Sequence, residues 1–313
     1  MSAVLTTVAP IFGLIALGFF AARYKWLADT AGKGIAQFTF LIAMPALLFR
    51  TIVVSDMGDA SPALLLSSYF ATVAIIWTLA AMASAFLLRR PAEEGAVFSM
   101  TASYGHIVLL GIPIAIGAYG DRATPAAAII VSMHVAVLWL AACIHLALAG
   151  RGGTSNPATL ARSVVREFTR NPIVVAIVLA ALWRQTGLGL HTTLDRGMAM
   201  LAQASVPCAL FAVGFTLAGF RIAGETRALA VSCVLKNLAM PALAWIVTVH
   251  VFGVPILPAT VITLFAAMPT GTATYLFASG NGIALETTSA SVALSTAVSM
   301  VTLPIVMILL GQP

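Results

Sequence analysis

The sequence predicts an all-α integral membrane protein with ten transmembrane helices, arranged as two inverted repeats of five helices each. Of its 313 residues, 61% are hydrophobic and only 8% are charged, whereas a soluble globular chain carries roughly 25% charged residues. Apolar stretches of about 20 residues, long enough to span a bilayer, recur along the whole chain. Pro113 and Pro269 interrupt two of these stretches at matching positions of the two halves. Paired interruptions of this kind mark transporters built from inverted repeats.

Ten apolar segments are expected to cross the membrane. They cover residues 4–22, 35–54, 63–88, 95–119, 124–149, 172–189, 198–219, 228–252, 256–279 and 285–310. Lys and Arg are unequally distributed between the two sides of the membrane. Eleven of them lie in the loops after segments one, three, five and seven, and four lie in the loops after segments two, four and six. Positively charged loops stay in the cytoplasm. We therefore expect a multi-pass protein of the cell inner membrane with both termini on the non-cytoplasmic side.

The two halves of the chain are expected to be repeats, residues 1–150 and residues 172–313. The run from Pro45 to Phe49 in the second segment matches the run from Pro207 to Phe211 in the seventh. The separation of these two runs is close to that of the two interrupting prolines. Because each repeat has an odd number of segments, the second repeat enters the membrane upside down.

The linker over residues 151–171 is predicted to carry a short amphipathic helix on the cytoplasmic surface. Ser155 and Asn156 precede Pro157, as at a capped helix start with proline in the first position. Apolar residues then follow at helical spacing, opposite Arg162 and Arg166.

Small and hydroxyl residues around the two prolines predict an anion site. Proline removes a helix donor and clashes with the preceding turn, and glycine lets the chain leave helical geometry. If each helix breaks there, Pro113 and Pro269 each begin a half-helix whose amides and positive dipole end point to the protein centre. The expected substrate-binding residues are Tyr104, Gly105, His106, Ile112, Pro113, Pro269, Thr270, Gly271 and Thr272. The alternative is a pair of ordinary proline kinks.

Histidine and lysine side chains inside the apolar segments are further candidates. His106 can donate to a carboxylate and titrates near neutral pH, so it predicts anion binding linked to proton uptake; the alternative is a neutral structural histidine. Lys236 lies inside the eighth segment, where an ionisable residue is a functional candidate, although it could instead snorkel to the cytoplasmic face. His134 in the fifth segment is a weaker candidate. The secondary candidates are Lys236, Asn237, Pro45 and Pro207.

Several chemistries have no support in the sequence. Every Asp and Glu lies in a loop or at a segment end, which disfavours antiport through a membrane carboxylate. The chain has no His-Glu-x-x-His, no Gly-x-Ser-x-Gly and no nucleotide-binding loop, so we expect no enzyme activity, no cofactor and no metal. The basic residues that give the net charge of +6 lie mainly at segment ends. There they orient the protein in the membrane and do not indicate nucleic-acid binding.

The chain resembles the auxin efflux carrier family, the bacterial relatives of plant PIN carriers, and within it the bacterial malonate transporters. The resemblance covers essentially the whole chain. The segments that carry it are 45–49, 104–113, 171–174, 206–211, 267–271 and 294–296. The family pattern usually has Asn, which contacts the substrate carboxylate, where this chain has His106, and often has Asn in the ninth segment where this chain has Ala273.

The resemblance implies a fold and a function. It implies fourth and ninth helices that are broken and cross at the prolines, a scaffold of segments one, two, six and seven, an elevator-like movement of the other six, and a homodimer. It also implies transport of small organic anions such as malonate, malate or auxin-like acids. A sodium-coupled organic-anion symporter and a non-transporting membrane sensor or structural protein are the alternative functions.

Overall fold

The computed structural model describes residues 2–54, 61–151, 172–219 and 225–311, and this part of the chain is helical with no β-strand. Six helical stretches within it are long and apolar enough to cross a membrane. Shorter apolar helices cover Ala9–Arg23, Pro172–Gln185 and Ile256–Ala266. The protein is therefore a multi-pass membrane protein. The amphipathic helix predicted between residues 151 and 171 lies outside the described residues.

The described helices and helical turns have the following bounds. The α-helices are α1 (Ser2–Arg23), α2 (Asp29–Phe38), α3 (Met44–Val54), α4 (Pro62–Met82), α5 (Ala92–Ser103), α6 (Ile112–Tyr119), α7 (Thr124–Leu146), α9 (Pro172–Gln185), α10 (Thr192–Leu217), α11 (Thr226–Cys233), α12 (Met240–Trp245), α13 (Ile256–Ala266), α14 (Ala273–Asn281) and α15 (Leu285–Leu309). The π-helical turns are η1 (Thr39–Ala43), η2 (Ala83–Leu87), η3 (Ile107–Gly111), η5 (Ala147–Arg151), η6 (Val234–Ala239) and η7 (Ile246–Val251), and η4 (Gly120–Ala123) is a 3₁₀ turn.

Where the α-helices carry an acidic side chain, that side chain lies in the first turn of its helix. These side chains are Asp29, Glu93, Glu94, Asp195 and Glu286. A carboxylate in this position is stabilised by the positive end of the helix dipole. The interiors of the described α-helices are consequently free of negative charge.

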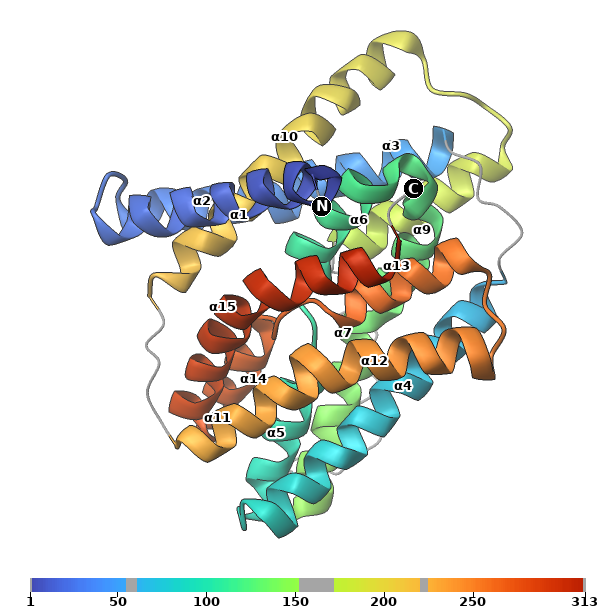
Figure 1. Ribbon diagram of the computed structural model, residues 1–313. Helices are drawn as coiled ribbons and strands as arrows, with labels where there is room; N and C mark the ends of the chain where they lie inside the picture. The colour runs from blue at the N-terminus through green and yellow to red at the C-terminus, as the bar shows by residue number, and fades with distance from the viewer. Residues whose placement is uncertain (1, 55–60, 152–171, 220–224, 312–313) are drawn as a thin grey trace.

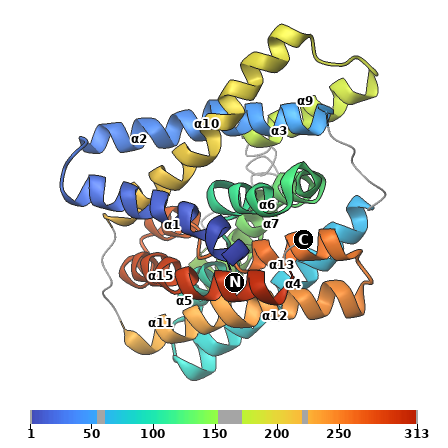
Figure 2. The ribbon, with the colours of Figure 1, turned by 45° about the horizontal axis from the view of Figure 1, so that its top comes forward.

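The helices form two groups (Figures 1 and 2). Helices α1, α2, α3, α9 and α10 lie together on one side, and α4, α5, α7 and α11 to α15 lie together on the other. Both halves of the sequence contribute to both groups. Helix α1 crosses α10 closely, since a Cβ on Gly18 would lie 2.1 Å from the Phe211 carbonyl oxygen and one on Gly214 would lie 1.9 Å from that of Ile15. Glycine at these positions allows the two backbones to touch.

Pro113 lies within a continuous helical stretch. Pro45, Pro113 and Pro241 are each the second residue of an α-helix that directly follows a π-turn. In such a turn the amide bonds a carbonyl five residues back, as Gly111 N does with His106 O at 3.2 Å. The wider turn accommodates the missing donor and the bulk of proline. The expectation that Pro113 begins a half-helix is therefore wrong, because the helix begins at Ile107.

Candidate functional site

Two helix breaks meet in the group that contains α5 and α13. The first break, residues 104–106, lies between α5 and η3, and the second, residues 267–272, lies between α13 and α14. The chain segments run antiparallel, with His106 N donating to Pro269 O at 2.8 Å and Gly271 N donating to Tyr104 O at 3.0 Å. The second break thus contains Pro269, but the half-helix that follows begins at Ala273 and not at the proline. The first lies at the candidate residues upstream of Pro113.

Glycines make the close approach of the two breaks possible. A Cβ on Gly271 would lie 2.8 Å from the Tyr104 ring, and one on Gly105 would lie 3.1 Å from the Phe265 carbonyl oxygen. The first distance is too short for a side chain without movement of the tyrosine. A side chain at Gly271 would therefore displace the Tyr104 ring, and one at Gly105 would fit only tightly against the Phe265 carbonyl oxygen.

Side chains satisfy the carbonyl groups that the breaks leave at the ends of α5 and α13. Thr270 Oγ1 donates to Thr101 O at 3.1 Å, and Lys236 Nζ donates to Ala266 O at 2.9 Å. Such groups cost several kcal/mol each when they are left unsatisfied in a bilayer. The Thr270 hydroxyl, expected to be a donor to substrate, is already used here.

Lys236 is fully buried beside the crossing. Its side chain is 0% exposed, and besides Ala266 O its Nζ contacts Met240 Sδ at 3.0 Å. The interpretation that Lys236 snorkels to the membrane surface is therefore wrong. Within the described residues no carboxylate pairs with this amino group, and its oxygen partner is the carbonyl group of Ala266 at the C-terminal end of α13.

Asn237 and Ser295 hold the second break through a hydrogen-bond chain. Thr270 N donates to Ser295 Oγ at 3.0 Å, and Ser295 Oγ donates to Asn237 Oδ1 at 2.8 Å. Asn237 Nδ2 in turn donates to the Ser295 carbonyl oxygen at 3.0 Å. Asn237 was a secondary candidate, whereas Ser295 was not singled out as a site residue. No spacing in the sequence connects Ser295 to Asn237, since α15 and η6 meet only in the folded chain.

The half-helices that leave the crossing have amide ends with no partner. In the described structure the amides of Ile107, Val108 and Leu109 at the start of η3 donate no hydrogen bond, and neither do those of Thr272 and Ala273 at the start of α14. Val108, Leu109, Thr272 and Ala273 are half-buried, although nearly all the residues around them are buried. These amide ends are therefore less enclosed than the rest of the crossing, and helix N-termini bind anions readily.

The remaining predicted site residues lie at the edge of the two breaks or outside them. His106 is 8% exposed and forms the N-cap position of η3. Ile112 and Pro113 are buried in the first turn of α6. Pro45 is half-buried on α3, and Pro207 is exposed inside an unbroken α10, so both lie outside the two breaks.

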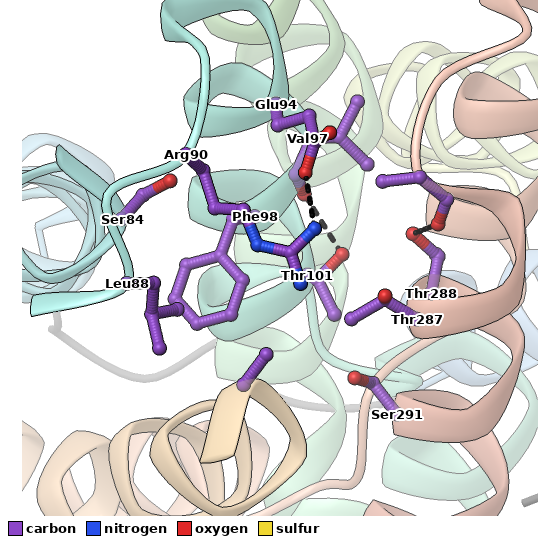
Figure 3. Close-up of a pocket in the computed structure, with 12 residues that line it drawn as sticks. Ser84, Leu88, Arg90, Glu94, Val97, Phe98, Thr101, Thr287, Thr288 and Ser291 are labelled. Carbon is purple, nitrogen blue, oxygen red and sulfur yellow. Dashed lines mark hydrogen bonds and ion pairs between the residues drawn. The ribbon is translucent and has the colours of Figure 1, made fainter. Parts of the chain in front are cut away.

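A small pocket, called here the Arg90 pocket, borders the crossing between α5, η2, α11 and α15 (Figure 3). Arg90 bonds Glu94 at 2.9 Å and also pairs with Glu225 at the start of α11. Partial burial disfavours its charge, but the hydrogen bonds and charges of the two glutamates outweigh this and raise the pKa of Arg90. The pocket reaches Thr101, whose carbonyl accepts from Thr270, and it contains the buried hydroxyls of Ser84 and Ser291, which make no hydrogen bond in the described chain.

The described residues contain no cluster of three or more His, Cys, Asp or Glu side chains that could hold a metal ion. Cys143, Cys208 and Cys233 are free thiols.

Comparisons with known proteins place the chain in a family. Residues 3–307 match the family described as membrane transport protein. The chain is 28% identical over 311 residues to the "Putative malonate transporter" of Rhizobium meliloti (strain 1021), covering 96% of this chain and 94% of that protein. It is 25% identical over 299 residues to the "Uncharacterized transporter YfdV" of Escherichia coli (strain K12), covering 95% and 94%. The chain belongs to this family of membrane transport proteins, the auxin efflux carrier family that its sequence resembles.

Proposed function

We propose that the protein is a secondary carrier of small carboxylate anions and that the anion binds between the amide ends of η3 and α14. The observation that carries the proposal is the set of unpartnered backbone amides in four half-buried residues, Val108, Leu109, Thr272 and Ala273. Amides at helix N-termini stabilise a carboxylate through hydrogen bonds and the helix dipole. His106 at the N-cap position of η3 and Lys236 beside Gly105 add donors and positive charge around the same place.

The substrate class follows from the same arrangement. Two separate amide ends suit a short dicarboxylate, which has one carboxylate for each end. The relative from Rhizobium meliloti is named for malonate, so malonate is the first compound to test. Tyr104, Gly105, Pro269 and Gly271 shape the crossing, while Ile112 and Pro113 support the η3 side.

The transport cycle is proposed to be of the elevator type. The crossing belongs to the group of α4, α5, α7 and α11 to α15, and the group of α1, α2, α3, α9 and α10 would act as the scaffold. This division is expected for ten membrane segments in two inverted five-helix repeats, with both termini outside the cytoplasm and two copies forming a homodimer. With the predicted topology, the Arg90 pocket lies on the cytoplasmic side of the crossing.

The first test is binding and transport of malonate. We expect malonate to raise the midpoint of thermal unfolding of the purified protein, and labelled malonate to enter proteoliposomes that contain it. Acetate and a neutral malonate diester serve as controls for the second carboxylate and for charge. A sodium requirement for uptake would favour the sodium-coupled symporter, and binding without any uptake would favour a sensor.

A sharper test removes one amide donor. Replacing Ala273 with its α-hydroxy acid exchanges the backbone N–H for an oxygen and keeps the methyl side chain. A hydrogen bond to a charged group contributes about 1.5–3 kcal/mol, so malonate affinity should fall by roughly 10- to 100-fold. The matched control is the same exchange at Ala63, an exposed alanine in the first turn of α4. Equal affinities for the two proteins would contradict the proposed site.

A further inference from the structure

A buried histidine of α7 touches the first helix break. His134 is 0% exposed, and its Nδ1 lies 2.8 Å from the hydroxyl of Tyr69 on α4. Its ring centroid lies 4.5 Å from that of Tyr104, the first residue of the break. The proposed anion site does not use this side chain.

The second ring nitrogen of His134 is left without a partner. Nε2 is buried and makes no hydrogen bond in the described structure, although the Gly105 backbone faces the ring. In neutral imidazole one nitrogen donates and the other accepts, whereas both donate in the charged form. Leaving a buried nitrogen unsatisfied costs free energy. The neutral ring can serve both contacts, with Nδ1 accepting from the Tyr69 hydroxyl and Nε2–H directed toward the Gly105 backbone, whereas a protonated ring would donate from both nitrogens.

The charges around His134 oppose its protonation in the empty protein. Lys236 of η6 is buried beside Gly105, and a Cβ on that glycine would lie 3.3 Å from Lys236 Nζ. A second positive charge beside it is unfavourable in a low-dielectric interior. The other titratable groups that face the ring are Tyr69 and Tyr104, with His106 next along the break. Helix α13, which packs on α7, has no ionisable side chain.

The remaining elements packed on α7 also carry ionisable groups. These groups are Arg50, Glu93, Glu94, Tyr119, Asp121, Arg122 and Arg184, and His145 lies near the end of α7 itself. None of them supplies a negative charge beside His134. A carboxylate bound at the crossing would supply it.

Building on the proposed anion site, we infer that His134 takes up a proton whenever a carboxylate binds at the crossing, which makes the protein a proton–anion symporter. The proton comes from the aqueous phase that supplies the anion and leaves with the anion on the other side. The anion compensates the paired charges of Lys236 and His134, and each charge in turn favours anion binding. Uptake of an anion against an inside-negative potential needs such a coupling, because the potential opposes it by about 2.3 kcal/mol per charge per 100 mV.

The experiment measures protons and malonate together. Malonate is added to the purified full-length protein in weakly buffered solution, proton uptake is followed with a pH indicator, and affinity is measured by calorimetry from about pH 6 to 8. Wild type should take up about one proton per malonate, and its affinity should fall about tenfold per pH unit. His134→Gln should still bind malonate but with no proton uptake and a flat pH profile.

Three comparisons decide the result. His145→Gln is the matched control, a histidine of the same helix that accepts from Trp77 Nε1 at 3.2 Å, and it should behave as wild type. Tyr69→Phe, which removes only the contact of Nδ1, should shift the pH profile without abolishing it.

Malonate binding without proton uptake in wild type would overturn the inference and leave the anion site standing. Proton uptake that persists in His134→Gln and disappears in His106→Asn would assign the proton to His106 instead. Failure of malonate to bind at all would overturn both proposals.

Discussion

Ser295→Ala removes one hydroxyl that makes two hydrogen bonds at the second break. The hydroxyl accepts from Thr270 N at 3.0 Å and donates to Asn237 Oδ1 at 2.8 Å, and all three residues are buried. Its removal leaves a buried donor and a buried acceptor without partners. Each such group costs about 1–3 kcal/mol, so the loss should lie in the range of about 2–6 kcal/mol. The break itself should loosen, since Thr270 lies opposite Gly105.

The matched control for this variant is Ser299→Ala. Ser299 is buried one turn further along α15, and its hydroxyl bonds only Thr296 O of its own helix, at 2.7 Å. We expect Ser299→Ala to change stability by less than about 1 kcal/mol. The assay is the denaturation midpoint of each variant in detergent, combined with malonate affinity. If Ser295→Ala is no less stable than Ser299→Ala and binds malonate equally well, the hydrogen-bond chain does not hold the break and the reasoning fails.

Three further predictions concern packing, charge and topology. Gly214→Ala places a Cβ 1.9 Å from the Ile15 carbonyl oxygen and should lower the free energy of unfolding by about 1–3 kcal/mol or more. The control, Gly197→Ala on the same helix, meets nothing within 4 Å and should raise that free energy by about 0.5–1 kcal/mol. Equal denaturation midpoints for the two variants would contradict the close crossing of α1 and α10. Lys236→Met keeps the packing but removes the ammonium group from Ala266 O, so malonate affinity should fall by about tenfold or more, and unchanged affinity in calorimetry would remove Lys236 from the site. A reporter fused to the C-terminus should report a non-cytoplasmic location, and a cytoplasmic signal would refute the predicted topology.

The sequence located the interrupted segments because their signals are local. Hydropathy identifies apolar stretches without any tertiary information, and the predicted substrate-binding residues include Tyr104 to His106 in the first break and Pro269 to Thr272 in the second. The prediction that the helix after the first break begins at Pro113 was wrong. The proline rule assumes a regular α-helix before the residue, whereas a π-turn precedes Pro113.

By itself, the sequence determined that this is a helical membrane protein with two interrupted segments that carry glycine, proline and hydroxyl residues. The tertiary structure decided what those residues do. The partner of Lys236 is the end of α13, that of Thr270 is the end of α5, and His134 reaches the first break from α7. Each of these contacts joins elements far apart in the chain. Because an isolated helix carries no information about which freed carbonyl or unpartnered amide will lie beside it, only the packed helices determine which polar groups are satisfied and which remain available to an anion.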